Sequence, residues 1–289
     1  MIKNIKDMQD KLILTADFFN LEQTFECGQC FRWEKQDSHS YIGIVKNQVV
    51  ELIQQKDRID IYNLDKEDFM NKWVDYFDLG SNYSSMIEKI SGEKIIDQAI
   101  EHGNGIRILN QEEWETLISF ILSTNNNIPR IKKIIDSLCR DFGDKIYYKG
   151  KKYYTFPSPE NLKDVKLEDL KNIKCGYRAN YIIDAVEKVN KGVVNLFELK
   201  NLSTEDARNE LLKIKGVGPK VADCILLFSM QKYDCYPVDV WIKKVTEQLY
   251  FKREANKNEI LEFAQKNWGE YAGFAQQYLF YFARSNLNK

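Results

Sequence analysis

Residues 211–224 read LLKIKGVGPKVADC, and this stretch is the most informative about how the second half of the chain folds. Apolar residues at helical spacing stand on both sides of Gly216 and Gly218, and Pro219 can open the next helix. Two glycines in the turn leave backbone N–H groups free at a helix start, where they can bind a phosphate. We therefore expect two helices joined by a tight turn over about residues 207–231; a plain turn without a ligand is the simpler alternative.

Two polar residues near this turn can carry chemistry. Lys220 lies in the first turn of the second helix, where the helix dipole disfavours an ammonium and helps an amine to act as a nucleophile. Cys224 follows on the same helix face. Asp239 stands at an expected helix N-cap after Pro237, and its carboxylate could steer a proton or stabilise a positive charge. A solvated surface lysine and a simple capping aspartate are the alternatives.

The chain changes its hydrophobic period along its length. Short runs rich in β-branched and aromatic residues occupy positions 12–16, 31–35, 41–45, 49–53 and 58–62. They predict an antiparallel meander, with helices from about residue 66 and a Tyr- and Lys-rich hairpin at 145–156. We expect an α+β protein, in which an N-terminal antiparallel-sheet domain with helices (1–110) precedes a larger all-helical domain (111–289).

Composition excludes several classes of protein. The chain has 289 residues, of which 44% are hydrophobic and 29% charged, the balance of a soluble globular protein. It shows no apolar run of a membrane span and no signal-peptide core, and its six cysteines are too few for a disulfide scaffold. We therefore expect a protein of a reducing, intracellular compartment, without contact to a membrane.

The net charge of −1 conceals an uneven distribution along the chain. Residues 1–127 contain 13 Lys or Arg and 22 Asp or Glu, whereas residues 128–178 contain 13 and 7. An acidic first half beside a basic middle segment suggests that a polyanion contacts one part of the molecule only. An ordinary Lys-rich surface is the alternative.

The stretch 216–220 (GVGPK) followed by 237–239 (PVD) resembles the helix-hairpin-helix, Gly/Pro-rich loop and Asp motif of base-excision DNA glycosylases. More narrowly, the chain is similar to 8-oxoguanine DNA glycosylase/lyases. Further segments in matching order cover roughly residues 20–285, namely 28–33 (GQCFRW), 123–130 (STNNNIPR), 156–158 (FPS), 175–178 (CGYR) and 272–276 (AGFAQ).

The resemblance implies a bifunctional enzyme of base excision repair that binds damaged double-stranded DNA as a monomer and flips the damaged nucleotide out of the duplex. Lys220 would attack the sugar C1′, displace 8-oxoguanine and form a Schiff base, and β-elimination would then nick the strand as an AP lyase does. Asp239 matches the carboxylate that supports this step.

The resemblance also assigns the residues of a base pocket. Gln276 and Phe280 are i, i+4 on a helical segment, so an amide for the Watson–Crick edge of a purine and a ring for stacking face the same way. Phe280 and Cys224 would lie on opposite faces of the base, although core packing is the alternative for Phe280. Gly28 matches a residue whose carbonyl accepts a hydrogen bond from N7–H, which 8-oxoguanine has and guanine lacks.

Further matches concern the opposite strand. Asn125, Arg130 and Arg178 match residues that bind the unpaired cytosine, whose acceptor edge suits guanidinium and amide donors. Tyr177 matches a wedge that fills the vacated stack. Generic contact with the DNA backbone is the alternative for the two arginines, both of which fall in the basic segment.

The turn itself has two implied roles. Gly216 and Gly218 would contact the DNA backbone. The resemblance also allows a monovalent or calcium ion that bridges to a phosphate, held by the backbone carbonyls of Leu212, Ile214 and Val217. No cofactor is expected to be required, and an iron–sulfur cluster is not expected because no cysteine follows Cys235.

Other positions depart from the family pattern or point elsewhere. Trp241 stands where well-known relatives have a histidine that contacts phosphate, and Ala283 stands where they have an acidic residue. Cys27 and Cys30 could form a redox pair or half of a zinc site, but no second pair lies at ligand spacing.

Two other functions stay open on the sequence alone. One is a monofunctional glycosylase for alkylated bases that uses Asp239 and water; the other is a non-catalytic helix-hairpin-helix DNA-binding protein. The Lys-, Ile- and Asn-rich composition points to an AT-rich bacterial genome and hence to the cytoplasm, at the chromosome.

Overall fold

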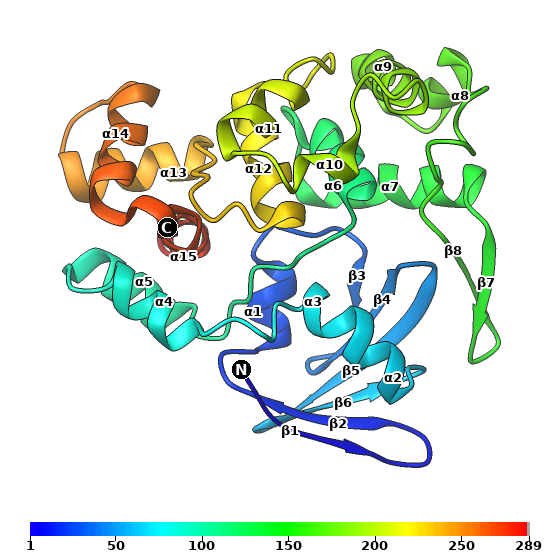
Figure 1. The fold of residues 1–289 in the computed structure, drawn as a ribbon, viewed down its shortest axis with the longest axis horizontal. Helices are drawn as coiled ribbons and strands as arrows, with labels where there is room; N and C mark the ends of the chain where they lie inside the picture. Colours follow the sequence, from blue (N-terminus) through cyan, green and yellow to red (C-terminus); the bar gives the residue numbers. More distant parts are fainter. Residues whose placement is uncertain (288–289) are drawn as a thin grey trace.

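The computed structural model describes residues 1–287, in which a six-stranded antiparallel sheet precedes a mostly helical part (Figure 1). The sheet consists of β1 (Ile2–Asp7), β2 (Leu12–Ala16), β3 (Trp33–Lys35), β4 (Ser40–Val45), β5 (Gln48–Gln55) and β6 (Arg58–Tyr62). Its strand order is β1-β2-β6-β5-β4-β3. The α+β class predicted from the sequence is confirmed.

The sheet differs from the expected meander at one edge. Strands β3 to β6 do follow one another, but β2 pairs with β6, and β1 extends the sheet beyond β2. Strand β1 was not predicted because it is an edge strand whose Ile2 and Ile5 are only half-buried and do not alternate with polar residues.

The buried face of the sheet explains the period of two in the sequence. Leu12 of β2 and Leu52 of β5 both pair with Ile61 of β6, and all three side chains are almost fully buried. Helix α1 (Leu21–Glu26) covers this core with Phe25, which stacks on Trp33 at 4.2 Å between ring centroids. The short helices α2 (Lys66–Asp68), η1 (Phe69–Trp73) and α3 (Val74–Tyr76) complete it.

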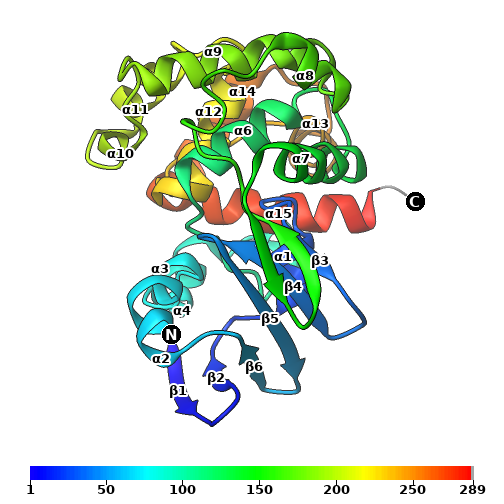
Figure 2. The same ribbon diagram turned by 90° about the vertical axis from the view of Figure 1, so that its right-hand side faces the viewer.

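From residue 63 to residue 287 the regular elements are helices apart from one hairpin, β7 (Lys145–Tyr148) and β8 (Lys151–Tyr154), which confirms the predicted Tyr- and Lys-rich hairpin. The Tyr148 hydroxyl donates to Glu51 of β5 at 2.6 Å, so the hairpin lies beside the large sheet (Figure 2). The helices are α4 (Tyr83–Ile90), α5 (Lys94–His102), α6 (Glu113–Ser123), α7 (Ile128–Phe142), α8 (Leu167–Asn172), η2 (Gly176–Arg178), α9 (Ala179–Asn190), α10 (Leu196–Leu199), α11 (Thr204–Leu211), α12 (Pro219–Met230), α13 (Val240–Val245), η3 (Thr246–Phe251), α14 (Lys257–Trp268), η4 (Gly269–Tyr271) and α15 (Ala272–Asn286).

Helix α15 lies between the sheet and the helices α6 to α14 (Figure 2). It packs against α4 and α5, which come early in the chain, and against α13. Tyr83 of α4 and Phe274 of α15 meet edge-to-face at 5.3 Å between centroids in the larger of the two apolar cores. A domain boundary at residue 110 stays a prediction. Helices α4 and α5 precede this position, but their buried apolar residues belong to the core of the helical part. No helix among residues 1–287 has the length and apolar character needed to cross a bilayer.

Candidate active site

The turn between α11 and α12 has the geometry that residues 211–224 predict. Gly216 has φ of +82°, and a Cβ atom there would lie 2.2 Å from the ring of Tyr181, so only glycine fits. Gly218 is the N-cap of α12 and Pro219 follows in the first turn. Because glycine has no side chain to cap the helix, the first N–H groups of α12 stay available to a ligand.

Two cavities meet at Lys220 and Asp239. The outer one is an open groove of about 800 Å³, and the inner one is a small cavity of about 50 Å³. Lys220 and Asp239 line both cavities and therefore lie at their junction. The groove is lined by Ser123, Thr124, Asn125, Asn126, Gly216, Gly218, Pro219, Lys220, Val221, Val238, Asp239, Val240, Lys243, Lys257 and Ile260. The inner cavity is lined by Cys27, Gly28, Phe120, Lys220, Cys224, Phe228, Pro237, Asp239, Gln276, Gln277 and Phe280.

Asp239 is the N-cap of α13, as its position after Pro237 predicts. Its carboxylate accepts hydrogen bonds from the backbone N–H groups of Trp241 at 3.0 Å and Ile242 at 2.9 Å. Burial raises the pKa of this carboxyl, while the Ile242 N–H and the charge of Lys220 act in the opposite direction. The cap fixes the carboxylate at the junction of the two cavities, close enough to Lys220 for their charges to interact.

Lys220 points from the first turn of α12 toward an aromatic wall. Its Nζ lies 5.5 Å from the ring centroid of Phe120. One helical turn further on, the buried thiol of Cys224 faces the inner cavity, and burial raises its pKa to about 11. Cys224 is therefore a neutral, polarisable part of the wall rather than a second nucleophile.

Helix α15 supplies the far wall of the inner cavity, with Gln276 and Phe280 on one face as their spacing predicts. The Gln276 amide nitrogen donates to the Pro237 carbonyl at 3.3 Å, but its buried Oε1 has no partner within residues 1–287. A buried amide oxygen without a donor is unusual in a folded protein. Here it is an acceptor that a bound base could satisfy.

Gly28 packs closely against the ring of Phe280 at the inner cavity. Its φ is +83°, and a Cβ atom would lie 2.9 Å from Phe280 Cε1. The backbone of residue 28 can approach the ring this closely only because it carries no side chain. Gly28 and Cys224 thus line the same cavity as the ring of Phe280, although they come from three distant segments of the chain.

The turn after α6 holds the residues assigned to the opposite strand. Asn125 lines the groove with φ of +47°, and the buried Arg178 donates from Nη2 to its carbonyl at 2.8 Å. Tyr177 is 50% exposed, and the Arg178 guanidinium lies 4.5 Å from its ring centroid. Arg130 is exposed in the first turn of α7. Arg178 is thus bound to backbone carbonyls, whereas Tyr177 and Arg130 are accessible.

The sequence interpretation missed Phe120, whose ring lies beside Lys220, and four polar residues at or beside these cavities. Lys243 and Lys257 line the groove, and Gln277 and Arg284 of α15 lie beside Gly28. Lys243 is four residues after Asp239, so helical spacing could have placed it on the same face. Arg284 is likewise four residues after Phe280 on α15, whereas no comparable spacing marks Lys257 or the contact of Gln277 with Cys27.

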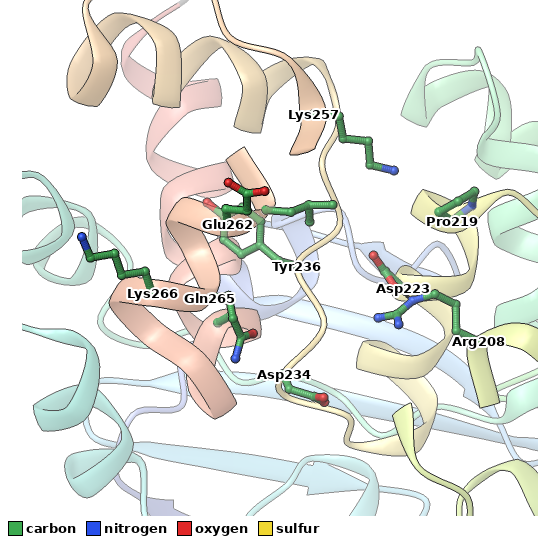
Figure 3. Close-up of a pocket in the computed structure, with 11 residues that line it drawn as sticks. Arg208, Pro219, Asp223, Asp234, Tyr236, Lys257, Glu262, Gln265 and Lys266 are labelled. Carbon is green, nitrogen blue, oxygen red and sulfur yellow. Dashed lines mark hydrogen bonds and ion pairs between the residues drawn. The ribbon is translucent and has the colours of Figure 1, made fainter. Parts of the chain in front are cut away.

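A further cavity, of about 630 Å³, shares the lining residues Pro219 and Lys257 with the groove (Figure 3). Arg208 and Asp223 form an ion pair there at 2.6 Å. Three basic side chains face three acidic ones, so this cavity does not favour an anion; they are Arg208, Lys257, Lys266, Asp223, Asp234 and Glu262. The groove has three lysines and one aspartate and suits a polyanion better.

The residues that the sequence suggested as metal or cation ligands lie in two separate places. Cys27 and Cys30 are buried free thiols, and the Cys27 thiol donates to the Thr24 carbonyl at 3.1 Å. Among residues 1–287, no three His, Cys, Asp or Glu side chains are grouped as a metal site. The carbonyls of Leu212, Ile214 and Val217 belong to the turn between α11 and α12, where Val217 N–H donates to the Ile214 carbonyl at 3.1 Å.

Comparison with known proteins covers both parts of the chain. Residues 11–117 match the family described as 8-oxoguanine DNA glycosylase, N-terminal domain, and residues 118–270 match the HhH-GPD superfamily base excision DNA repair protein. An N-glycosylase/DNA lyase of Saccharomyces cerevisiae is 32% identical over 93% of this chain and 85% of its own length.

Solved structures agree over almost the whole chain. The Clostridium acetobutylicum 8-oxoguanine glycosylase/lyase in complex with double-stranded DNA containing cytosine opposite 8-oxoG is 42% identical, with a TM-score of 0.96 over 99% of each chain. MBOgg1, in complex with a low affinity DNA ligand, is 47% identical, with a TM-score of 0.96 over 100% of each chain.

Proposed function

The chain belongs to the 8-oxoguanine DNA glycosylase family of the HhH-GPD superfamily, and we therefore infer that it is a glycosylase/lyase that removes 8-oxoguanine from double-stranded DNA in base excision repair. The observation that carries the assignment of residues is the position of Lys220 and Asp239 at the junction of the groove and the inner cavity. A flipped nucleotide would place its sugar at this junction, its base inside and its phosphates in the groove.

Lys220 is the nucleophile of the proposed reaction. The free amine attacks C1′, the N-glycosidic bond breaks, and its electron pair leaves with the base, which takes up a proton. Loss of a proton from nitrogen and opening of the sugar ring give a Schiff base, and removal of a C2′ proton expels the 3′-phosphate. The carboxylate of Asp239 stabilises the positive charge that develops at the sugar.

The inner cavity is the proposed base pocket. Its volume of about 50 Å³ holds roughly one or two water molecules, so the half-buried ring of Phe280 must move before a purine can enter. Oε1 of Gln276 then accepts from the N–H donors on the Watson–Crick edge of the base. The Gly28 carbonyl accepts from N7–H, and the base lies between Phe280 and Cys224.

The groove residues that the sequence did not mark give a first prediction. We expect Lys243→Ala and Lys257→Ala each to weaken DNA binding and to make the negative slope of log K against log salt shallower by about 1, since each removes one phosphate contact. Fluorescence anisotropy with an abasic-site duplex between roughly 50 and 200 mM salt measures the slope. Lys266→Ala, which changes a lysine of the cavity in Figure 3, is the control and should keep the wild-type slope. A wild-type slope in Lys243→Ala and Lys257→Ala as well contradicts the assignment.

Arg178 is expected to act on the opposite strand through the turn at Asn125. Arg178→Ala leaves the Asn125 carbonyl without its donor and the Thr124 carbonyl with only the Tyr177 hydroxyl at 3.3 Å, which should lower the free energy of unfolding by about 1–3 kcal/mol. Excision should also become less dependent on cytosine opposite the lesion. Single-turnover rates with cytosine and adenine opposite 8-oxoguanine measure this preference. Arg130→Ala is the comparison, because the exposed Arg130 can only contact the opposite strand directly, whereas Arg178 also supports the turn.

The test of the activity itself is borohydride trapping on a duplex with one 8-oxoguanine opposite cytosine. The proposed mechanism gives a covalent protein–DNA complex. A monofunctional glycosylase would release the base without a complex, and a DNA-binding module would do neither. The proposal has three further parts: a monomeric state, a bacterial cytoplasmic location, and a cation site formed by the turn carbonyls of Leu212, Ile214 and Val217. The likeness to the Clostridium acetobutylicum enzyme supports the bacterial location.

A further inference from the structure

Residues 26–29 include Cys27 and Gly28, which line the inner cavity, and three of their four carbonyl groups accept a hydrogen bond from a side chain. Arg284 Nη1 donates to the Glu26 carbonyl at 3.1 Å, and Gln277 Nε2 donates to the Cys27 carbonyl at 3.0 Å. Gln111 Nε2 donates to the Gln29 carbonyl at 2.8 Å. In the part of the chain that the structure describes, no donor reaches the carbonyl of Gly28, a residue that lines the cavity.

The residues on both sides of Gly28 are fixed by buried contacts. Gln29 is fully buried, and its side chain donates to the carbonyls of Thr24 at 2.8 Å and Arg107 at 2.7 Å. The same side chain accepts from the Leu109 N–H at 2.9 Å. On the other side, Gln277 is 2% exposed where it binds the Cys27 carbonyl. The peptide group that carries the Gly28 carbonyl therefore lies between two peptide groups that cannot turn freely.

Helix α15 joins this support to the rest of the pocket. Gln276 and Gln277 are adjacent, and Phe280 and Arg284 are i, i+4 on one face. The Arg284 guanidinium lies 5.5 Å from the ring centroid of Phe280 and also holds the Glu26 carbonyl. One helix thus presents an acceptor and a ring to the base and, through Gln277 and Arg284, fixes the direction of a second acceptor.

We propose that Gln277, supported by Arg284, is a positioning residue for lesion recognition: by holding the Cys27 carbonyl, it directs the Gly28 carbonyl at the purine N7. This inference rests on the proposed function. A carbonyl in that place attracts the N7–H of 8-oxoguanine and repels the lone pair that guanine carries at N7. Both effects require that the carbonyl keeps a fixed direction. A carbonyl that can rotate away neither attracts the N7–H of 8-oxoguanine nor repels the N7 lone pair of guanine.

Binding measured without chemistry tests the proposal. In the Lys220→Gln background, we compare dissociation constants for duplexes with 8-oxoguanine or guanine opposite cytosine, with and without Gln277→Met. Methionine matches glutamine in length and apolar packing but cannot donate. We expect the preference for 8-oxoguanine to fall about tenfold, the order of one lost hydrogen bond. Affinity for a duplex with a tetrahydrofuran abasic site should not change, since that ligand has no base.

Each other outcome is decisive. An unchanged preference for 8-oxoguanine, or an equal loss of affinity for all three duplexes, overturns the positioning role. If the Lys220→Gln protein itself shows no preference for 8-oxoguanine, the proposed function fails and the inference with it. Arg284→Met provides a second measurement should Gln277→Met not fold: it removes the neighbouring support, and the preference should fall by a smaller factor while abasic-site affinity is kept. A preference that does not change in this variant also overturns the proposal.

Discussion

Replacing Lys220 by glutamine is expected to abolish the covalent complex with DNA and to lower the rate of 8-oxoguanine release by roughly 10⁴-fold or more, the order seen when a covalent enzyme loses its nucleophile. Glutamine keeps the length and polarity of the side chain but has no amine that can form a Schiff base. The remaining groups of the pocket, Asp239 among them, can still bind the flipped nucleotide. DNA affinity should therefore fall far less than the rate.

The measurement is borohydride trapping together with single-turnover base release on a duplex with 8-oxoguanine opposite cytosine. Lys215→Gln is the matched control, because Lys215 lies in the same turn but its side chain is 73% exposed and pairs with Asp184 at 3.6 Å. The control should trap like the wild type. A covalent complex that persists in the Lys220→Gln protein would mean that another amine is the nucleophile.

The second large effect is expected for Asp239→Asn. Base release should fall by about 10²- to 10⁴-fold, since the charge that stabilises the developing positive sugar is lost. Asparagine is as good an N-cap as aspartate, so the hydrogen bonds to Trp241 and Ile242 can be kept. The fold should therefore survive while the activity does not.

The stability of this variant has a defined pH dependence. Burial raises the pKa of Asp239 above that of the unfolded chain, so the folded wild type loses stability as pH rises through the raised value. The asparagine carries no charge, so Asp239→Asn should unfold at an equal or higher temperature at neutral pH. The difference should vanish at pH values below the pKa of an unfolded aspartate. Melting curves from about pH 3 to 8 check this.

The same raised pKa predicts the acid limb of the activity. The wild-type rate should fall on acidification at a higher pH than an exposed aspartate would give, because the carboxylate must be ionised to act. Asp234→Asn, at an exposed position of the loop before α13, is the control and should keep the wild-type profile. An acid limb that persists unchanged in the residual activity of Asp239→Asn would assign it to another group.

Local chemistry made part of this molecule predictable. The two glycines, Pro219 and the flanking apolar residues specify the turn between α11 and α12, and Pro237 and Asp239 specify the start of α13. Each signal acts within about four residues, through backbone sterics, capping and helical spacing. Short runs of β-branched and aromatic residues likewise predicted five of the six strands of the sheet, and in a strand such as β2 the burial alternates along the chain.

The α+β class, the two helices with their turn, and the residue types that the chemistry needs all follow from local sequence. Tertiary packing decides that β6 pairs with β2 in the sheet, and it decides which side chains line the two cavities. Gln277 contacts Cys27 across 250 positions of sequence, and Arg178 donates to a turn 53 positions away. Such contacts arise from the packing of whole helices and loops. The residues next to Gln277 and Arg178 in the sequence do not indicate which distant residue each of them contacts.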